Sequence, residues 1–551
     1  MEDADCLRYH FGEIKQKTKH IDLQVEESPE ISQNFFINRL FSYKRRQQSS
    51  GYWKYVVGVY KNLFLMFYFN WTSIITAPIS TIAFLTFYPF ISFVLFVFEI
   101  GLKVFMDFLG GSVLIKHISE IYGQGLSIPN WGAPQLLFST ESQELIKLTS
   151  LTLGTPYTAN NDDNEDRHRT FDISIAQSLT VLSALIYERQ DEFITKAFQL
   201  GNDNEHTPAI EQEMNRLIWE SENRIRTIAR TYGLHFAGVT ELKSLAGPFC
   251  GLYWPINYEQ PFIIVVFKGT TPTNYSEFLV DATLQRVDAR TFLFGSAHEG
   301  FYDSLFSTSA DNDSTNHDPY YSIQKAINHI ASELSHRGPV QIWVTGHSLG
   351  AALASLLFAR LLKSPEDLGE HCQLRDAYVM GCPAIGDNDF AANFASFTNM
   401  PLSRPSVFWR LINQSDVVSH IPVGYDNSMV GYYAPSTDFF NYSHIGHAVQ
   451  ITWPWMSKPI KIYPSSYESN LKVNVVDSKE NYNNNTMDSV VSGLEVRHMN
   501  NTKQQQHKQK KKNLIGFIES MYPFYIYDHL PNGYFEGLER ARDYYMQQNH
   551  T

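Results

Sequence analysis

The chain has 551 residues and a formal net charge of −13, which argues against a general nucleic-acid-binding protein because such a protein needs a basic surface. Its length exceeds an ordinary domain of roughly 100 to 200 residues and fits one large domain with appended segments. The four cysteines include no CxxC pair, which indicates a reducing compartment and no structural zinc site.

The first segment, residues 1–54, is predicted to be a polar tail. It lacks the basic start and the apolar core of a secretory signal. A hydrophobic block, residues 55–109, follows. Within this block the stretch from Asn62 to Phe98 contains no charged side chain and is longer than the roughly 20 residues that cross a bilayer as one helix.

Pro78 divides the hydrophobic block into two apolar arms, which predicts a helical hairpin associated with a membrane. Pro89 interrupts the second arm, which either spans the bilayer or enters one leaflet only. Basic residues on both sides of the block favour cytosolic ends. We therefore expect a location at the endoplasmic reticulum or the lipid-droplet surface, with the main domain in the cytosol. The alternative is a hairpin buried in the core of the main domain.

Residues 110–170 are interpreted as a connector, and helical and strand-like segments alternate from residue 171 to residue 545. Apolar residues at helical spacing predict a helix over 174–188. Continuous apolar runs are typical of strands buried on both faces of a parallel sheet. Such runs occupy residues 261–270, 340–346, 377–383 and 408–416. The alternation predicts an α/β domain with a mostly parallel central sheet.

The composition changes at residues 465–513, where Asn, Gln, Lys and Ser dominate. A segment of this composition buries too little apolar surface to offset its chain entropy. We interpret it as a disordered, low-complexity insertion in the main domain, and ordered structure is expected to resume at Leu514.

The motif GHSLG, residues 346–350, lies between a predicted strand and an apolar segment of helical length. This context places Ser348 in a tight turn at the carboxyl edge of the sheet, where Gly346 and Gly350 avoid steric collision. The positive end of the following helix faces the position where negative charge develops in acyl transfer. We interpret Ser348 as a nucleophile, and the alternative is a serine that only caps the helix.

A serine nucleophile needs a base, and in an α/β hydrolase the acid and then the base follow it along the chain. Asp416 ends a predicted strand, so its carboxylate can orient an imidazole; the alternative is an ordinary turn aspartate. The histidines after it are His420, His444, His447, His498, His507, His529 and His550. We favour His529, in a loop before a final helix. The others lie too close to Asp416, precede a strand, or fall in the insertion or at the terminus.

With these residues the chain resembles the class 3 lipases, the family of the fungal lid-covered triacylglycerol lipases. The matching segments are FKGT (267–270), AHEGFYDS (297–304), GHSLG (346–350), GCPAIGD (381–387), NQSDVVSHIP (413–422) and DHLPNGYF (528–535). The resemblance implies an α/β-hydrolase fold with Ser348, Asp416 and His529 as catalytic triad. It also implies an oxyanion hole formed by the backbone N–H groups of Thr270 and Leu349.

The resemblance also implies a lid between the FKGT and AHEGFYDS segments. Residues 271–286 place Tyr275, Phe278 and Leu279 at the spacing of a short amphipathic helix. This helix is either a flap that shields the substrate groove or an ordinary surface helix. The family pattern is altered at one point, because two extra residues separate His529 from Tyr534 compared with compact fungal members.

The predicted function is hydrolysis of acylglycerol esters through an acyl-enzyme intermediate, at a membrane or lipid-droplet surface. No metal ion, organic cofactor, nucleic acid or obligatory protein partner is expected. A second interpretation is a phospholipase or lipid transacylase that uses the same triad. A third is a membrane-anchored scaffold without catalytic activity.

Overall fold

The computed structural model describes residues 104–122, 126–130, 134–156, 168–203, 207–241, 249–257, 260–269, 286–306, 319–398, 406–422, 441–465, 472–478 and 527–549, with isolated positions between 61 and 101. The predicted polar tail and most of the predicted hydrophobic block lie outside the described residues. In the part of the chain that is described, no helix combines the length and the apolar composition needed to cross a membrane.

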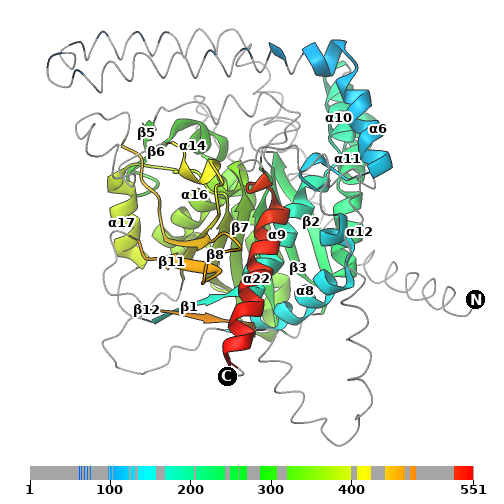
Figure 1. The fold of residues 1–551 in the computed structure, drawn as a ribbon. Helices are drawn as coiled ribbons and strands as arrows, with labels where there is room; N and C mark the ends of the chain where they lie inside the picture. The colour runs from blue at the N-terminus through cyan, green and yellow to red at the C-terminus, as the bar shows by residue number, and fades with distance from the viewer. Residues whose placement is uncertain are drawn as a thin grey trace, which may run out of the picture.

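An eight-stranded sheet lies at the centre of the described structure, in the order β11-β10-β9-β8-β7-β4-β3-β2 (Figure 1). The strands are β2 (Leu234–Glu241), β3 (Phe249–Pro255), β4 (Phe262–Phe267), β7 (Val340–His347), β8 (Cys372–Met380), β9 (Phe408–Asn413), β10 (His447–Ile451) and β11 (Ile460–Tyr463). The five strands from β4 to β10 in this order are parallel, and β2, β3 and β11 add antiparallel flanks. The prediction of a mostly parallel α/β sheet is confirmed for the central strands.

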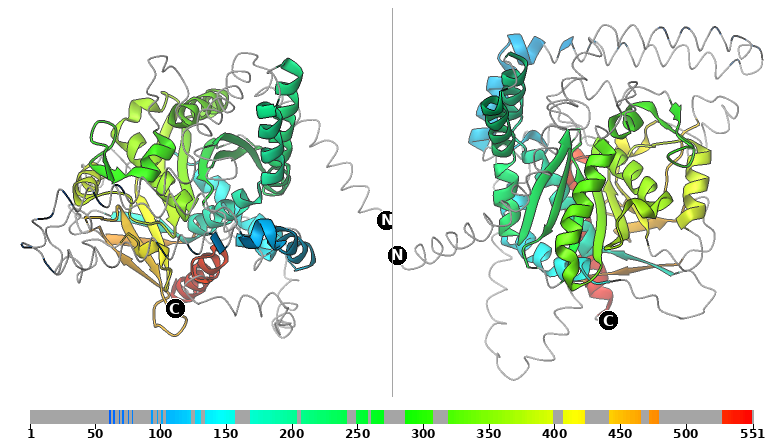
Figure 2. Two further views of the ribbon diagram at one scale, coloured as in Figure 1. Left: turned by 90° about the horizontal axis from the view of Figure 1, so that it is seen from above. Right: turned by 180° about the vertical axis from the view of Figure 1, so that it is seen from behind.

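The central strands are buried on both faces, as their continuous apolar sequences predict. Every residue of β4 is buried. Alternate side chains of this strand point into different cores: Ile263 and Val265 pack with helix α16 (Leu349–Lys363). Ile264 and Val266 pack with helix α9 (Ile173–Leu185) on the other face. The view from above shows helices on both sides of the sheet (Figure 2).

The remaining helices complete the two outer layers. On the α16 face lie α14 (Glu299–Leu305), α15 (Pro319–Leu334) and α17 (Asn388–Thr398). The α9 face is covered also by α12 (Asn223–Thr231) and α22 (Pro531–Asn549). Helices α10 (Asp191–Asp203) and α11 (Pro208–Ser221) pair around a small apolar cluster of their own. Short elements are η1 (Val104–Phe108), η2 (Ile128–Asn130), η3 (Ile186–Glu188), β5 (Arg286–Asp288), β6 (Ser296–His298), η4 (Ser335–Arg337), η5 (Pro365–Asp367) and η6 (Val418–His420).

The interpretation of residues 110–170 as a connector needs correction. This segment contains α6 (Gly111–Tyr122), α7 (Pro134–Phe138) and α8 (Thr140–Leu153). Leu145, Ile146 and Leu153 of α8 are fully buried, and the indole N–H of Trp343 in β7 donates to the carbonyl oxygen of Leu153 at 2.9 Å. Because α8 packs against α9 and bonds to Trp343 of the sheet, it is an integral part of the main domain.

The predicted disorder of residues 465–513 also needs correction at its start. Strand β12 (Lys472–Val476) pairs in parallel with β1 (His168–Asp172), some 300 residues earlier in the chain. Val473 and Val475 pack against the core on the α9 face. Just after the strand, Asp477 is buried and forms an ion pair with Arg542 of α22, with Nε and Oδ2 3.0 Å apart. The alternating valines and the buried ion pair therefore stabilise a folded structure at residues 472–477, although the surrounding segment is polar.

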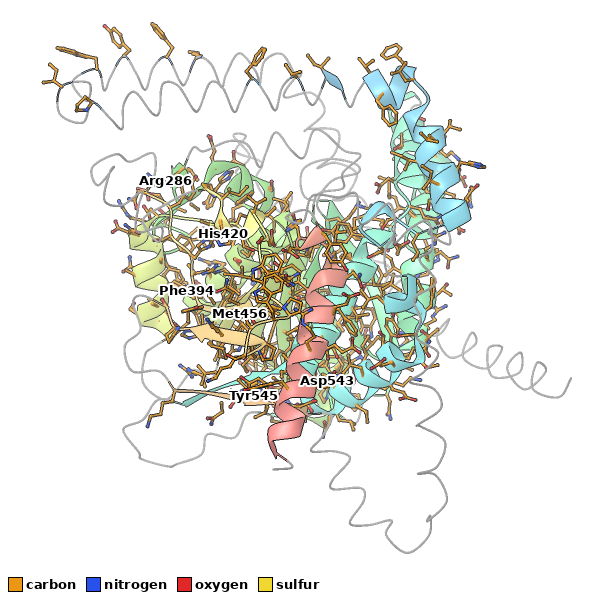
Figure 3. All side chains as sticks on the ribbon, viewed as in Figure 1. Arg286, Phe394, His420, Met456, Asp543 and Tyr545 are labelled. Atoms are coloured by element: carbon orange, nitrogen blue, oxygen red, sulfur yellow. The ribbon has the colours of Figure 1, made fainter. Side chains whose placement is uncertain are left out.

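Helix α22 runs along α9 from the carboxyl edge of the parallel strands toward the opposite edge. His420, on the turn after β9, lies near the first end of α22, and Asp543 and Tyr545 lie toward its other end (Figure 3). The packing of Tyr534, Leu538 and Ala541 into the core fixes the helix. The loop that precedes α22 is thereby held at the edge where β7, β8 and β9 end.

Candidate active site

The turn between β7 and α16 holds Ser348 in a strained conformation. Its φ of 59° and ψ of −132° are unusual for a residue with a side chain. A Cβ on Gly346 would lie 2.3 Å from the carbonyl oxygen of Gly350, and a Cβ on Gly350 would lie 2.3 Å from that of Phe267. Both glycines of the motif are therefore required for the turn. Backbone strain of this kind concentrates at functional sites.

Three side chains from distant parts of the chain meet beside this turn. Nε2 of His529 lies 2.9 Å from Oγ of Ser348. On the other side of the ring, Nδ1 lies 3.0 Å from each carboxylate oxygen of Asp416. The structure thus brings together the three residues that the sequence singled out, in an arrangement suited to moving a proton from the hydroxyl to the imidazole.

Asp416 is fully buried and is held by its surroundings. The backbone N–H of Val418 donates to Oδ1 at 2.9 Å, and the hydroxyl groups of Ser419 and Tyr534 donate to Oδ2. Burial alone raises the pKa of this carboxyl. The charge of His529 and the hydrogen bonds from His529 and Tyr534 outweigh burial, so the pKa of Asp416 lies below its ordinary value. The group is therefore an oriented carboxylate at neutral pH.

The loop that carries His529 is fixed to the end of β9. The side-chain amide of Asn413 donates to the carbonyl oxygen of Asp528 at 2.9 Å, and the backbone N–H of Ser415 donates to the Asp528 carboxylate at 3.0 Å. The two extra residues after His529 are accommodated, because Tyr534 still reaches Asp416 from the first turns of α22.

Gly381, directly after β8, leaves the space that the imidazole occupies. Its φ is +62°, and a Cβ there would lie 2.8 Å from Cε1 of His529 and 2.9 Å from Oδ2 of Asp416. A side chain at this position would displace the histidine or the aspartate. The sequence marked this glycine only as part of the GCPAIGD segment, and its role follows from the tertiary structure.

His347, the residue before the serine, was not predicted to have a role. Its ring is buried, with the hydroxyl of Tyr187 2.9 Å from Nδ1 and the carbonyl oxygen of His529 2.6 Å from Nε2. Burial first, and then the charge of the neighbouring His529, lower the pKa of His347 to about 3. Nothing local in the sequence distinguishes this histidine from any other residue at the variable position of the motif.

The competing histidines have other environments in the structure. Nδ1 of His420 donates to the backbone carbonyl oxygen of Asp416 at 2.8 Å. His420 therefore stabilises the turn that carries Asp416. Nδ1 of His447 accepts from the backbone N–H of Ser465. His444 is half-buried, and the loss of solvation around its ring lowers its pKa well below the ordinary value. His498, His507 and His550 lie outside the described residues.

Only one of the two predicted oxyanion donors can be placed. Leu349 is the first residue of α16, where backbone N–H groups have no acceptor within the helix. Thr270 follows the described end of β4, and Tyr275, Phe278 and Leu279 of the predicted lid also lie outside the described residues. Within the described ranges, no group of three or more His, Cys, Asp or Glu side chains is arranged to hold a metal ion.

Two further motif residues support the scaffold. Nδ1 of His298 accepts from the backbone N–H of Phe301 and caps α14. Oδ1 of Asp387 accepts from the backbone N–H groups of Ser296 and Phe390, and so joins β6 to the start of α17. The matching segments AHEGFYDS and GCPAIGD therefore position loops around the site.

A parallel sheet with a serine on a strand–turn–helix elbow, and with a histidine and a carboxylate at the same edge, defines the class of α/β hydrolases. A family model, lipase (class 3), matches residues 264–425, which span β4 to the turn after Asp416. This part of the chain is therefore similar to the class 3 lipases.

Several curated proteins are similar to this chain over part of its length. Triacylglycerol lipase OBL1 of Arabidopsis thaliana is 24% identical over 208 residues, which are 33% of this chain and 36% of that protein. A lipase of Rhizomucor miehei is 27% identical over 161 residues, 29% of this chain and 37% of the relative. Phospholipase A1-II 1 of rice, Oryza sativa, is 27% identical over 173 residues, 30% of this chain and 41% of the relative. The chain thus spans well under half the length of these relatives.

Solved lipase structures are also similar. The lipase of Rhizopus microsporus var. chinensis shares 18% identity, with 57% of this chain and 88% of that chain covered and a TM-score of 0.33. The triacylglyceride lipase of Rhizomucor miehei shares 20% identity, with 44% and 75% covered and a TM-score of 0.30.

Proposed function

We propose that this protein is a lipase that hydrolyses acylglycerol ester bonds at a membrane or lipid-droplet surface. The observation that carries the proposal is the chain of contacts from Ser348 through His529 to Asp416. The ring of His529 bridges a hydroxyl and a buried carboxylate, which is the arrangement that activates a serine for attack on an acyl carbon.

In the proposed reaction, Oγ of Ser348 attacks the ester carbonyl carbon while Nε2 of His529 takes the hydroxyl proton. The Asp416 carboxylate accepts a hydrogen bond from Nδ1 and stabilises the imidazolium. His529 then gives its proton to the departing alcohol, and the acyl group remains on Ser348. Water attacks the acyl-enzyme with His529 again as base, which releases the fatty acid and restores the serine.

The oxyanion that forms at the carbonyl is proposed to accept hydrogen bonds from the backbone N–H groups of Leu349 and Thr270. The position of Leu349 at the start of α16 supports its part, because its N–H and the helix dipole both favour negative charge there. Removal of one such donor typically raises the barrier by about 2.7 to 4 kcal/mol.

The acylglycerol class is supported by the names of the relatives, two of which are lipases. The rice relatives are named phospholipases A1, and this likeness favours a phospholipid as the second candidate substrate. Both classes present an ester of a long acyl chain, so the same three residues serve either reaction.

The surface association is supported by exposed apolar side chains in the amino-terminal part. In and beside η1 and α6, Val104, Phe108, Leu109 and Val113 are 41 to 79% exposed. Isolated described positions in the hydrophobic block are also exposed: Phe64, Tyr68, Trp71, Ile75, Phe93, Val97 and Ile100. Exposed apolar area on this scale is typical of a lipid contact. We propose that this region holds the enzyme at its substrate, and that Tyr275, Phe278 and Leu279 belong to a lid.

The test compares wild type, Ser348→Ala and the matched control Ser396→Ala, in which the hydroxyl lost lies on an exposed residue of α17 that donates to Asn393. Labelling with a fluorophosphonate should be lost in Ser348→Ala and kept in the control.

The substrate class is tested with the same three proteins, which are incubated with emulsified trioleoylglycerol and with phosphatidylcholine vesicles. The released products are identified by mass spectrometry. Equal labelling of Ser348→Ala and wild type rules out the nucleophile. Fatty acid released only from phosphatidylcholine moves the assignment to a phospholipase.

A further inference from the structure

The proposed reaction does not use the imidazole of His347 directly. This ring connects Tyr187 of η3 with the backbone of His529. It lies behind His529, with the ring centroids 4.7 Å apart. Its two nitrogens contact the hydroxyl of Tyr187 and the backbone carbonyl oxygen of His529. A continuous chain of hydrogen bonds thus runs from η3 through the serine turn to the loop of the proposed base.

The chemistry of the partners fixes the direction of these hydrogen bonds. A carbonyl oxygen only accepts, so Nε2 of His347 carries the proton and donates to His529 at 2.6 Å. In the neutral ring Nδ1 then has a lone pair, and it accepts from the Tyr187 hydroxyl at 2.9 Å. The His529 carbonyl therefore selects this tautomer of His347, and the hydroxyl of Tyr187 satisfies the nitrogen that is left without a proton.

Charge explains why the ring must stay neutral. His347 is buried, and a second cation beside His529 would oppose the imidazolium that the proposed reaction requires. Burial and the charge of His529 keep the pKa of His347 far below neutral pH. The ring can therefore donate to the His529 carbonyl throughout the reaction without adding charge to the site.

We propose that His347 and Tyr187 are positioning residues that hold His529 in line with Ser348. His347 holds the histidine by its backbone carbonyl, whereas Asp416 holds it by its ring. The inference rests on the proposed function, since it assigns a role to neighbours of the proposed base. In this proposal neither residue contacts the substrate. Their loss is therefore expected to lower kcat and to leave KM unchanged.

The deciding comparison is His347→Gln with His347→Leu, measured by hydrolysis of the water-soluble ester p-nitrophenyl butyrate. The glutamine amide can donate to the His529 carbonyl from nearly the same place as Nε2, whereas leucine fills the volume without a donor. We expect kcat to fall by roughly 10- to 100-fold in the leucine variant with KM unchanged, because a displaced base loses its alignment. Glutamine should recover most of kcat.

Tyr187→Phe provides a second variant that leaves the packing of the ring in place. It should lower kcat by roughly 3- to 10-fold, the worth of one hydrogen bond, and should have no added effect in the His347→Leu background. Tyr232→Phe is the matched control, because it likewise removes one buried tyrosine hydroxyl. That hydroxyl donates to the backbone carbonyl oxygen of Leu137, away from the site. Its kcat should equal that of wild type.

The outcomes separate this inference from the function on which it rests. If Ser348→Ala keeps wild-type hydrolysis, the proposed function is wrong. If Ser348→Ala is inactive but His347→Leu and Tyr187→Phe both keep wild-type kcat, only the positioning role is wrong. Should His347→Leu fail to fold, the Gln and Phe variants decide: an unchanged kcat in Tyr187→Phe overturns the proposal, and a loss of kcat that Tyr232→Phe does not share supports it.

Discussion

The geometry of the site depends at residue scale on small side chains placed against reactive ones. Gly381 is the clearest case, because its positive φ and its contact with His529 and Asp416 are two separate constraints. Either constraint alone disfavours a side chain, but only the contact bears on chemistry. The two can therefore be separated by comparing this glycine with another that has the conformation without the contact.

Gly381→Ala should reduce kcat by about 100-fold or more, because the new methyl group displaces the imidazole or the carboxylate. Gly233, in the turn before β2, has a φ of +79° and open space around it, so Gly233→Ala is the matched control for backbone strain alone. Both variants should lose about 1 kcal/mol of stability from the unfavourable φ. Measurement of kcat and of urea unfolding for both proteins checks this. Equal kcat in the two variants would contradict a steric role for Gly381.

At the scale of elements, short connections join parts of the chain that are remote in sequence. Asp172 ends β1 and caps α9, where its Oδ1 accepts from the backbone N–H of Ile175 at 3.1 Å. It also accepts a hydrogen bond from the Ser478 hydroxyl, just beyond β12. Burial, with a contribution from the charge of Asp477, raises the pKa of Asp172 to about 6. The junction of β1, β12 and α9 is thus sensitive to pH.

The sign of this effect follows from proton linkage. Between about pH 4 and pH 6 the folded protein holds a proton on Asp172 that the unfolded chain has released, so stability falls as the pH rises through this interval. The full loss is about 3 kcal/mol, from the difference between the two pKa values. Asp172→Asn keeps a good helix cap and cannot titrate.

Relative to wild type, Asp172→Asn should therefore be more stable at pH 7.5 than at pH 4, with most of the change between pH 4 and 6. Urea unfolding as a function of pH measures it, with the exposed Asp389→Asn as control for the loss of one carboxylate. A stability difference between Asp172→Asn and wild type that is constant with pH would show that Asp172 is charged in the folded protein.

At the scale of the whole molecule, the amino-terminal part divides into two regions with different structural roles. Most described apolar side chains before Gly111 are exposed, whereas Leu145, Ile146 and Leu153 of α8 are fully buried. Each buried leucine or isoleucine contributes about 1.5 to 3 kcal/mol, and a whole domain is stable by only about 5 to 15 kcal/mol. Loss of α8 therefore removes a large part of the stability, and loss of the earlier segment removes little.

A chain that begins at Gly110 should fold, unfold cooperatively and hydrolyse p-nitrophenyl butyrate, but should no longer float with phospholipid vesicles. A chain that begins at His168 should not fold, because it lacks the carbonyl and the apolar side chains that cover Trp343. Circular dichroism, thermal unfolding and vesicle flotation distinguish the two. Flotation of the first chain to the same extent as wild type would be evidence against lipid contact through residues 1–109.

The predicted strands and the observed strands agree closely where burial is continuous. The apolar run 340–346 corresponds to β7, Val340–His347, and the run 408–416 contains β9, Phe408–Asn413. Helix α9, with η3, occupies the predicted 174–188. These elements were predictable because each is buried by its own side chains, whichever neighbour covers it.

The sequence did not predict strand β12 or helix α8, and both are stabilised by contacts with residues far away in the chain. Strand β12 lies in a polar segment and is stabilised by β1 and by Arg542 of α22. Helix α8 has little local signal beyond its Ser139 cap, and its importance comes from its packing in the core beside α9. Local pattern carries no information about such long-range contacts, so composition alone favoured a connector and a disordered insertion.

The sequence by itself determined the chemistry at each position of interest: a serine on a strand–helix turn, an aspartate at a strand end and a histidine before the last helix. Only the tertiary structure decided that these side chains meet, that Gly381 leaves room for them, and that His347 contacts both Tyr187 and the backbone of His529. The physical reason is that residue type and local periodicity are properties of a few neighbouring residues, whereas hydrogen-bonding distance between residues 181 positions apart depends on the packing of the whole domain.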